Sequence, residues 1–261
     1  MTTANEKAVT KKEQAPPPAV FQRKTQSTDQ IDQKDILIPK ILLMQGLSEL
    51  VTSEQATMGD MVNSVTSKVL GGKSKPIQFI PMITNKSWIV LDKETQKFKG
   101  AVPFGPANAN WKWEDVDPKD GKTVKNMQSL NFYCFLEADL ADPAALPYML
   151  SFRSTSYTAG KKLITHFAQA NMIGIVPWAQ VFELSCKKEQ NDKGTYYVFD
   201  VKPTKSTDPV HAPKLEQWAE VLSKGAHQVD ESDLKEAEKE VGGVASPSTS
   251  SKPFDEKTAQ F

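Results

Sequence analysis

One helix is predicted to interrupt a chain of strands, and this order constrains the fold more than any other feature of the sequence. Residues 147–153 alternate between two sides, which is the period-two pattern of a strand. Serines and threonines that favour turns and caps follow, and apolar residues then recur at helical spacing in Leu163, Ile164 and Phe167. We therefore expect a strand that leads into a helix of about three turns, packed on the sheet through these three residues.

Further runs have the composition of strands, at residues 76–82, 86–92, 130–136, 176–187 and 195–203. A turn at 191–194 joins the last two runs into a hairpin. Thr84 and Asn85 are predicted to turn between the first two runs, which makes a second hairpin. At least six strands with a single helix between the fourth and the fifth fit a closed or partly closed antiparallel barrel, so the predicted fold class is mainly β.

Residues 100–121 are predicted to form a long loop, because prolines and glycines break regular structure throughout the stretch. The loop holds Phe104, Trp111 and Trp113. A loop of this length within a compact domain is usually functional or disordered, and its two tryptophans argue against disorder. We therefore expect a functional loop.

The termini differ from the middle of the chain. Residues 1–34 are rich in Lys, Gln, Thr and Pro and cannot bury enough apolar surface to order themselves, which predicts a disordered arm. Residues 35–228 are expected to form the folded domain, ending in a helix from Pro213 to Gly225. Residues 229–261 are predicted to be an acidic tail, with a charged helix over 232–241 followed by a flexible segment.

The formal net charge of zero hides an asymmetry along the chain. From Asp230 onward eight acidic residues stand against four lysines, which leaves 28 basic and 24 acidic residues before it. A mildly basic body therefore carries an acidic tail. Cys134 and Cys186 lie in separate apolar runs, as expected of buried thiols in a reducing compartment. The sequence has neither a signal peptide pattern nor an apolar run long enough for a membrane span, so we expect a cytoplasmic protein.

Motifs of common catalytic sites are absent from the sequence. It contains no glycine-rich phosphate loop, no HExxH, no CxxC and no GxSxG. The three histidines have no evident shared partner, and the paired acids resemble solvated turns. We therefore expect a protein that is not an enzyme and that has no cofactor and no metal site.

Aromatic residues interleaved with cations predict a binding function instead. Bases of single strands stack on aromatic faces while lysines contact phosphates. The predicted nucleic-acid-binding residues are Lys86, Trp88, Lys99, Phe104, Trp111, Lys112, Trp113, Arg153, Tyr157, Lys161 and Lys162. Each has a plainer interpretation, because lysines are commonly solvated and Trp88 alternates within a strand like a core residue. Arg153, Lys161 and Lys162 are expected to converge where the strand meets the helix, as a cradle for phosphate.

Four segments resemble the single-stranded DNA-binding proteins of bacteriophages: IPKILLMQGLSELV, GDMVNSVTSKVLGG, YMLSFRSTSYTAGKKLITHF and VFELSCKKEQNDKGTYYVFDVKP. The resemblance covers roughly residues 36–203. It implies an OB-like barrel that coats single-stranded DNA during phage replication and recombination in the cytoplasm of the host.

The end of the chain adds to this resemblance. Single-strand-binding proteins of bacteria and phages typically end in a flexible acidic segment with a terminal aromatic residue, which docks replication enzymes. Asp255, Glu256 and Phe261 match that pattern, although Lys257 and the neutral residues around it dilute the charge. The implied partners are single-stranded DNA, replication or recombination proteins at the tail, and a second copy of the chain.

Two other functions stay open on the sequence. The first is a phage structural or assembly protein whose β-domain binds protein partners. The second is a nuclease or recombination enzyme with acidic residues gathered by the fold.

Overall fold

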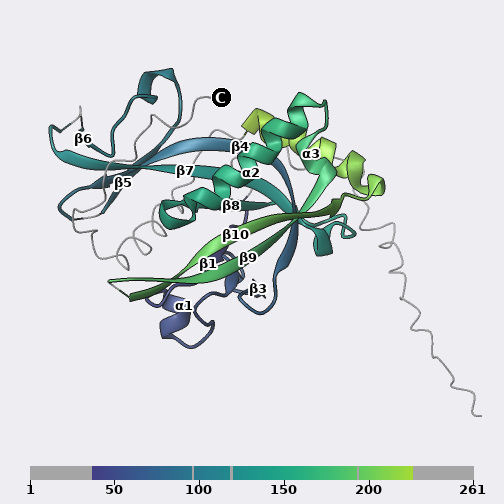
Figure 1. Cartoon of the computed structure of the whole chain (residues 1–261), viewed down its shortest axis with the longest axis horizontal. Coiled ribbons are helices and arrows are strands. Elements are labelled where there is room, and N and C mark those ends of the chain that lie inside the picture. Colours follow the sequence, from purple (N-terminus) through teal and green to yellow (C-terminus); the bar gives the residue numbers. More distant parts are fainter. Residues whose placement is uncertain (1–36, 96, 118–119, 193, 226–261) are drawn as a thin grey trace, which may run out of the picture. The chain divides into compact units, whose positions relative to one another are not determined.

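The computed structural model describes residues 37–225, apart from 96, 118–119 and 193. The arm predicted for 1–34, the helix predicted for 232–241 and the tail residues Asp255, Glu256 and Phe261 lie outside these residues. The described part is mainly β, as predicted, and its main sheet has seven antiparallel strands (Figure 1). These strands are β4 (Ile77–Asp92), β5 (Phe98–Pro103), β6 (Glu114–Val116), β7 (Thr123–Leu136), β8 (Tyr148–Arg153), β9 (Gln180–Asn191) and β10 (Gly194–Ser206).

A second, smaller sheet precedes the main one. Its strands are β1 (Ile41–Leu43), β2 (Met61–Asn63) and β3 (Val69–Gly71), and the short helix α1 (Glu49–Thr52) lies between the first two. Two longer helices follow, α2 (Tyr157–Met172) and α3 (Ala212–Gly225). Single 3-10 turns occupy Pro106–Asn108, Glu137–Asp139, Ser154–Ser156, Pro177–Ala179 and Pro209–His211.

The hairpin predicted between residues 76 and 92 is wrong, because β4 runs unbroken through Thr84 and Asn85. The 14 residues of β7 pair with both halves of β4, and this long partner holds the whole stretch extended. The register shifts between Pro81 and Ile83, so Met82 is the extra residue of a β-bulge. A bulge is one of the few places where a strand accepts proline.

The loop predicted over 100–121 is partly structured. Its first part belongs to β5, which pairs with β4, and its last part contains β6, which pairs with β7. Two of the expected breakers, Gly100 and Pro103, lie within β5 itself, so these short elements form because neighbouring strands pair with them. The hairpin predicted around 191–194 is confirmed, since β9 and β10 pair along their length. The helix predicted from Pro213 to Gly225 corresponds to α3.

Helices α2 and α3 pack on opposite faces of the main sheet. The α2 face carries Phe132 and Phe152, whose rings lie 5.6 Å apart, and it buries Leu163 and Phe167 of α2. Ile164 packs against the same core, so the predicted contact of this helix is confirmed. The α3 face carries Tyr133 and Phe135 and buries Leu215 and Leu222, with Trp218 against Phe135. In Figure 1, α2 crosses the sheet between β4 and the β9–β10 hairpin.

The main sheet curls so that β1 contacts both β8 and β10. Beside β8, the backbone N–H of Met149 donates to the carbonyl of Pro39 at 2.8 Å. Beside β10, the side chain of Gln45 accepts from the N–H of Tyr197 at 3.0 Å and donates to its carbonyl at 2.8 Å. An amide side chain thus pairs with the backbone edge as a strand would. The result is a curled, partly closed barrel with β1 at its seam.

No helix among residues 37–225 has the length and apolar character needed to cross a membrane. Both cysteines in this range are free and buried, as predicted. Burial raises the pKa of the Cys134 and Cys186 thiols above their ordinary value.

Candidate nucleic-acid interface

Three aromatic rings gather where β4 meets the segment after β5. Trp88 lies on β4 and is only 3% exposed, and its ring centroid lies 6.1 Å from that of Phe104 and 6.2 Å from that of Trp111. Phe104 is 36% exposed and Trp111 is half-buried. Trp88 is therefore the buried base of the cluster, and the other two rings form its accessible part.

Asn108, in the turn after β5, holds these rings together. Its side chain accepts from the N–H of Gly105 and donates to the carbonyl of Pro103, both at 2.8 Å. Its backbone carbonyl accepts from the indole N–H of Trp88 at 3.1 Å and from the N–H of Trp111 at 3.2 Å. The sequence prediction did not include this residue. An asparagine in a segment rich in proline and glycine is a turn signal that would have drawn attention to it.

Two lysines border the aromatic cluster on the α2 face. The ammonium of Lys86 lies 3.9 Å from the ring centroid of Phe104, in cation–π geometry. The ammonium of Lys161, on α2, lies 5.4 Å from the ring centroid of Tyr157. Burial, and then the neighbouring charge of Lys161, lower the pKa of Lys86 below its ordinary value.

Gln128 connects the helix to the rings. It lies opposite Trp88 in the register of β4 and β7, and its side chain accepts a hydrogen bond from the Tyr157 hydroxyl. Burial raises the pKa of Tyr157, which keeps this hydroxyl a donor. Five residues of the predicted set therefore form one surface, which we call the aromatic–basic surface: Lys86, Phe104, Trp111, Tyr157 and Lys161. Trp88 was also predicted to contact nucleic acid, but its ring is buried beneath this surface and supports it.

Lys112 and Trp113 continue from this surface toward β6. Both are exposed, Trp113 at 51%. Asn126 on β7 fixes their backbone, because its side chain donates to the carbonyl of Lys112 at 3.0 Å and its N–H donates to the carbonyl of Trp113 at 2.7 Å. A ring that is half exposed on a fixed backbone is suited to stacking.

Lys99 does not join the aromatic–basic surface in this structure. Its ammonium lies 2.6 Å from Asp117 and 2.7 Å from Asp120, and hydrogen bonds to these two carboxylates raise its pKa. The paired acids neutralise its charge, so Lys99 ties β5 to the segment after β6. Sequence reasoning missed this role because the two aspartates are distant in the chain.

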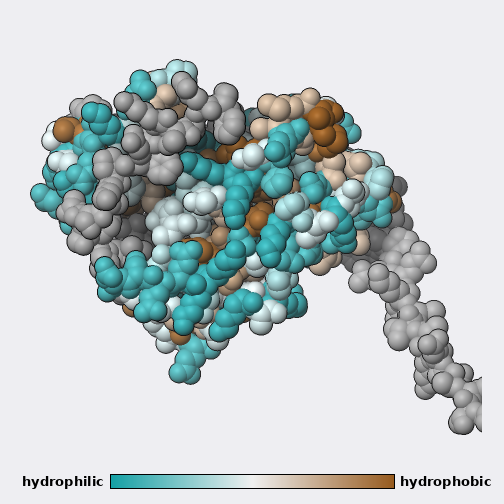
Figure 2. Space-filling view, in the orientation of Figure 1, coloured by the Kyte–Doolittle hydropathy of each residue, from teal (hydrophilic) through white to brown (hydrophobic). Residues whose placement is uncertain are grey.

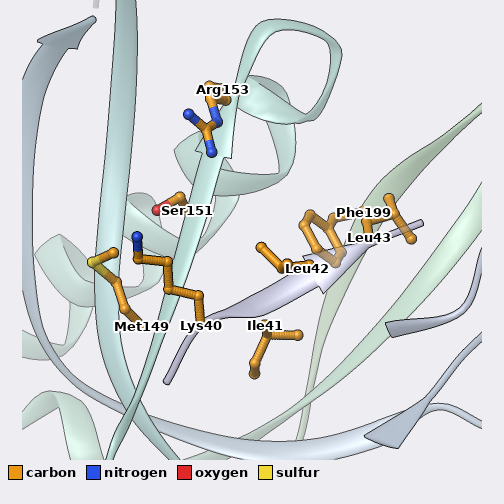
Figure 3. Close-up of a pocket in the computed structure, with 8 residues that line it drawn as sticks. All are labelled: Lys40, Ile41, Leu42, Leu43, Met149, Ser151, Arg153 and Phe199. Carbon is orange, nitrogen blue, oxygen red and sulfur yellow. The ribbon is translucent and has the colours of Figure 1, made fainter. Parts of the chain in front are cut away.

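The phosphate cradle predicted at the start of α2 does not form, because Arg153 lies on the opposite face of the sheet from Lys161. Arg153 pairs with Ser129 in the register of β7 and β8, whereas the neighbouring Phe152 is fully buried on the α2 face. In Figure 3, Arg153 lies with Ser151 and Lys40 along β8. The cavity that these residues line is only about 10 Å³, which is barely room for one water.

Lys162 lies next to Lys161 but contacts another element. Its ammonium is 3.2 Å from Asp200 on β10. Within the part of the chain that the structure describes, no group of three or more His, Cys, Asp or Glu residues is placed to hold a metal ion.

The described residues define a mainly β protein whose curled sheet displays a mixed aromatic and basic surface. The chain belongs to the Pam3 phage gp34-like protein family, whose model matches residues 10–228. This membership supports the phage origin that the sequence predicts. No curated protein and no solved structure matches the chain.

Proposed function

We propose that this phage protein binds single-stranded DNA through the aromatic–basic surface, without catalysing a reaction. The observation that carries the proposal is the position of Lys86, whose ammonium caps the accessible ring of Phe104. Phe104 and Trp111 both pack against Trp88. Lys161 and Tyr157 supply a second cation and a third accessible ring on the same face. Sequence-tolerant binding of single strands combines rings that stack on bases with cations that contact phosphates.

The fold supports the same proposal. We interpret the curled sheet with β1 at its seam and one internal helix as an OB-like barrel, a fold that commonly binds single-stranded nucleic acids. We place the activity in the cytoplasm of the host cell, during replication or recombination of phage DNA. Docking of replication proteins at Asp255, Glu256 and Phe261 stays a prediction, since these residues lie outside the described part.

Tryptophan fluorescence during titration with oligo(dT) tests the proposal. We expect binding to quench the fluorescence, to be tighter for single strands than for duplex DNA, and to weaken with salt at a slope of about −0.7 per phosphate contacted. Trp111→Ala should weaken binding by roughly 1–3 kcal/mol, the contribution of one stacked base. Trp178→Phe, which alters the core on the α3 face, is the matched control.

Two results would contradict the proposal. One is equal affinity for single strands and duplex, and the other is binding that does not depend on salt. A loss of affinity in Trp178→Phe as large as that in Trp111→Ala would instead show that the substitutions act through the fold.

The alternative function is assembly with further copies of the chain, and an apolar surface at the end of α2 favours it. Met172 is 85% exposed and Ile173 is 71% exposed. They adjoin a cavity of about 240 Å³ lined in part by Phe182 and Val176. Figure 2 shows hydrophobic surface at the upper right, over this end of the helix.

A second copy that inserts its Met172 and Ile173 into this cavity would make a symmetric contact. Light scattering without DNA distinguishes the two functions. Stable oligomers that dissociate in Ile173→Glu, together with no binding of oligo(dT), would favour assembly over DNA binding.

A further inference from the structure

We propose that the path of the DNA backbone continues from the aromatic–basic surface across α2 to the β9–β10 hairpin. Lys162 and Lys187 are its phosphate contacts there, and Asp200 is the residue that positions both. The inference rests on the proposed binding of single-stranded DNA and extends it to a second group of residues. Of these three residues, only Lys162 belongs to the set that the sequence predicts.

Asp200 holds two lysines from different elements at the surface. Its carboxylate is buried, with a residue exposure of 5%. One oxygen lies 3.2 Å from the ammonium of Lys162 on α2, and the other lies 2.7 Å from the ammonium of Lys187 on β9. The lysine side chains themselves are 55% and 59% exposed. A single buried acid therefore fixes two cations that face solvent.

The carboxylate is charged, and the arrangement keeps a net positive charge. Burial alone would raise the pKa of Asp200, but hydrogen bonds from Lys187 and Lys162 outweigh it and lower the pKa. Two lysines and one carboxylate carry one net positive charge. Each ammonium has three N–H donors, so a single hydrogen bond to Asp200 leaves donors for a phosphate oxygen.

The position of α2 joins this group to the aromatic–basic surface. Lys161 and Lys162 are adjacent in the chain, yet the ammonium of Lys161 lies by Tyr157, whereas that of Lys162 reaches Asp200 on β10. Figure 1 shows α2 between β4 and the β9–β10 hairpin. The four lysines Lys86, Lys161, Lys162 and Lys187 therefore come from β4, α2 and β9, with α2 between the two strands.

A purely structural role would explain the same contacts, since Asp200 also joins α2 to the hairpin. The two roles differ in one measurable property. A lysine that contacts phosphate contributes to the salt dependence of binding, by about 0.7 in the slope of log K against log salt concentration for single strands. A lysine that only holds α2 against the hairpin contributes to the stability of the fold and leaves this slope unchanged.

Comparison of Lys187→Gln with Lys188→Gln tests the proposal. The two lysines are neighbours on β9 and are both exposed, but their side chains point to opposite sides of the strand. We expect Lys187→Gln to lower the salt slope for long oligo(dT) by about 0.7, whereas Lys188→Gln leaves it unchanged. Lys187→Arg, which keeps the charge, should restore the slope.

Oligonucleotide length separates this inference from the proposed function. The shortest oligo(dT) that still quenches Trp111 should be bound equally by the wild type and by Lys187→Gln. If Lys187→Gln and Lys188→Gln both bind long oligo(dT) with the same salt slope as the wild type, the extension onto the hairpin is wrong. Binding at the aromatic–basic surface would still stand. If the wild type binds no single-stranded DNA, the proposed function itself is wrong, and the inference falls with it.

Discussion

At the residue scale, acidic partners decide how much charge a lysine near the predicted site keeps for a ligand. Asp117 and Asp120 neutralise Lys99, whereas Asp200 shares one charge between Lys162 and Lys187. Cations that look equivalent in the sequence therefore differ in available charge. Asn108 has a comparable role for the rings, because it accepts from Trp88 and Trp111 through one carbonyl.

Asp200→Asn should make the protein less stable at neutral pH, because it removes the ion pairs with Lys162 and Lys187. The loss should be only about 1 kcal/mol, since both lysines are largely exposed. The pKa of Asp200 in the folded state lies below its ordinary value of 3.8. The stabilisation is therefore fully present above that value, and it is lost as the pH falls through the lower pKa of the folded state. Urea unfolding of both proteins between pH 2 and 7 measures the difference, which should shrink in acid.

The control for this prediction is Asp192→Asn, at the exposed tip of the same hairpin. An exposed surface substitution should change the free energy of unfolding by less than about 0.5 kcal/mol. A difference between wild type and Asp200→Asn that stays constant down to pH 2 would show that the carboxylate charge does not stabilise the fold.

At the scale of elements, α2 fits the sheet closely enough to require a glycine. Gly160 lies on the buried side of α2, and a Cβ atom there would lie 2.7 Å from the Cβ of Phe152 and 3.0 Å from a methyl group of Leu130. The closeness of the helix to β7 and β8 explains how Tyr157 reaches Gln128. Packing at this glycine therefore helps to position one end of the aromatic–basic surface.

Gly160→Ala should destabilise the protein by roughly 1–3 kcal/mol, the usual cost of overpacking a core. Helix propensity alone predicts the opposite sign, since alanine is favoured over glycine by about 1 kcal/mol. Thr158→Ala, at an exposed position of the same helix, is the control and should be neutral or slightly stabilising. Thermal unfolding decides between them, and a Gly160→Ala protein more stable than wild type would refute the close contact.

At the scale of the whole described domain, side chains from outside the main sheet close the seam beside β10. Gln45 makes two hydrogen bonds with the backbone of Tyr197. A second contact protects the same strand, because the N–H of Phe199 donates to the Ser156 hydroxyl at 3.1 Å. An open strand edge invites pairing with another chain, so these contacts also guard against aggregation.

Gln45→Ala should cost about 1–3 kcal/mol, because it removes two hydrogen bonds and leaves the edge of β10 unpaired at Tyr197. Hydrogen exchange of the Tyr197 amide should become faster, while amides in the middle of β7 keep their protection. The control is Gln55→Ala, an exposed glutamine after α1. Equal exchange at Tyr197 in both variants would show that Gln45 does not maintain the seam.

Local patterns in the sequence predict those elements that depend on neighbours in the chain. The strand over β8, the helix α2, the β9–β10 hairpin and the helix α3 all follow from periodicity and turn residues. The aromatic residues and lysines that form the aromatic–basic surface are also visible in the sequence. The amphipathic spacing of these elements and the residue types of this surface are properties of short segments. They therefore do not depend on contacts with the rest of the chain.

Tertiary structure alone decides the features that depend on strand pairing. Pairing with β7 extends β4 through Thr84 and Asn85, although these residues are also compatible with a turn. The alternation of side chains along β8 sends Arg153 to the face opposite Lys161. Local sequence patterns specify a mainly β chain that is rich in aromatic and basic residues. The register between distant strands decided which of them meet, because contacts such as that between Asp200 and Lys187 arise only once those strands pair.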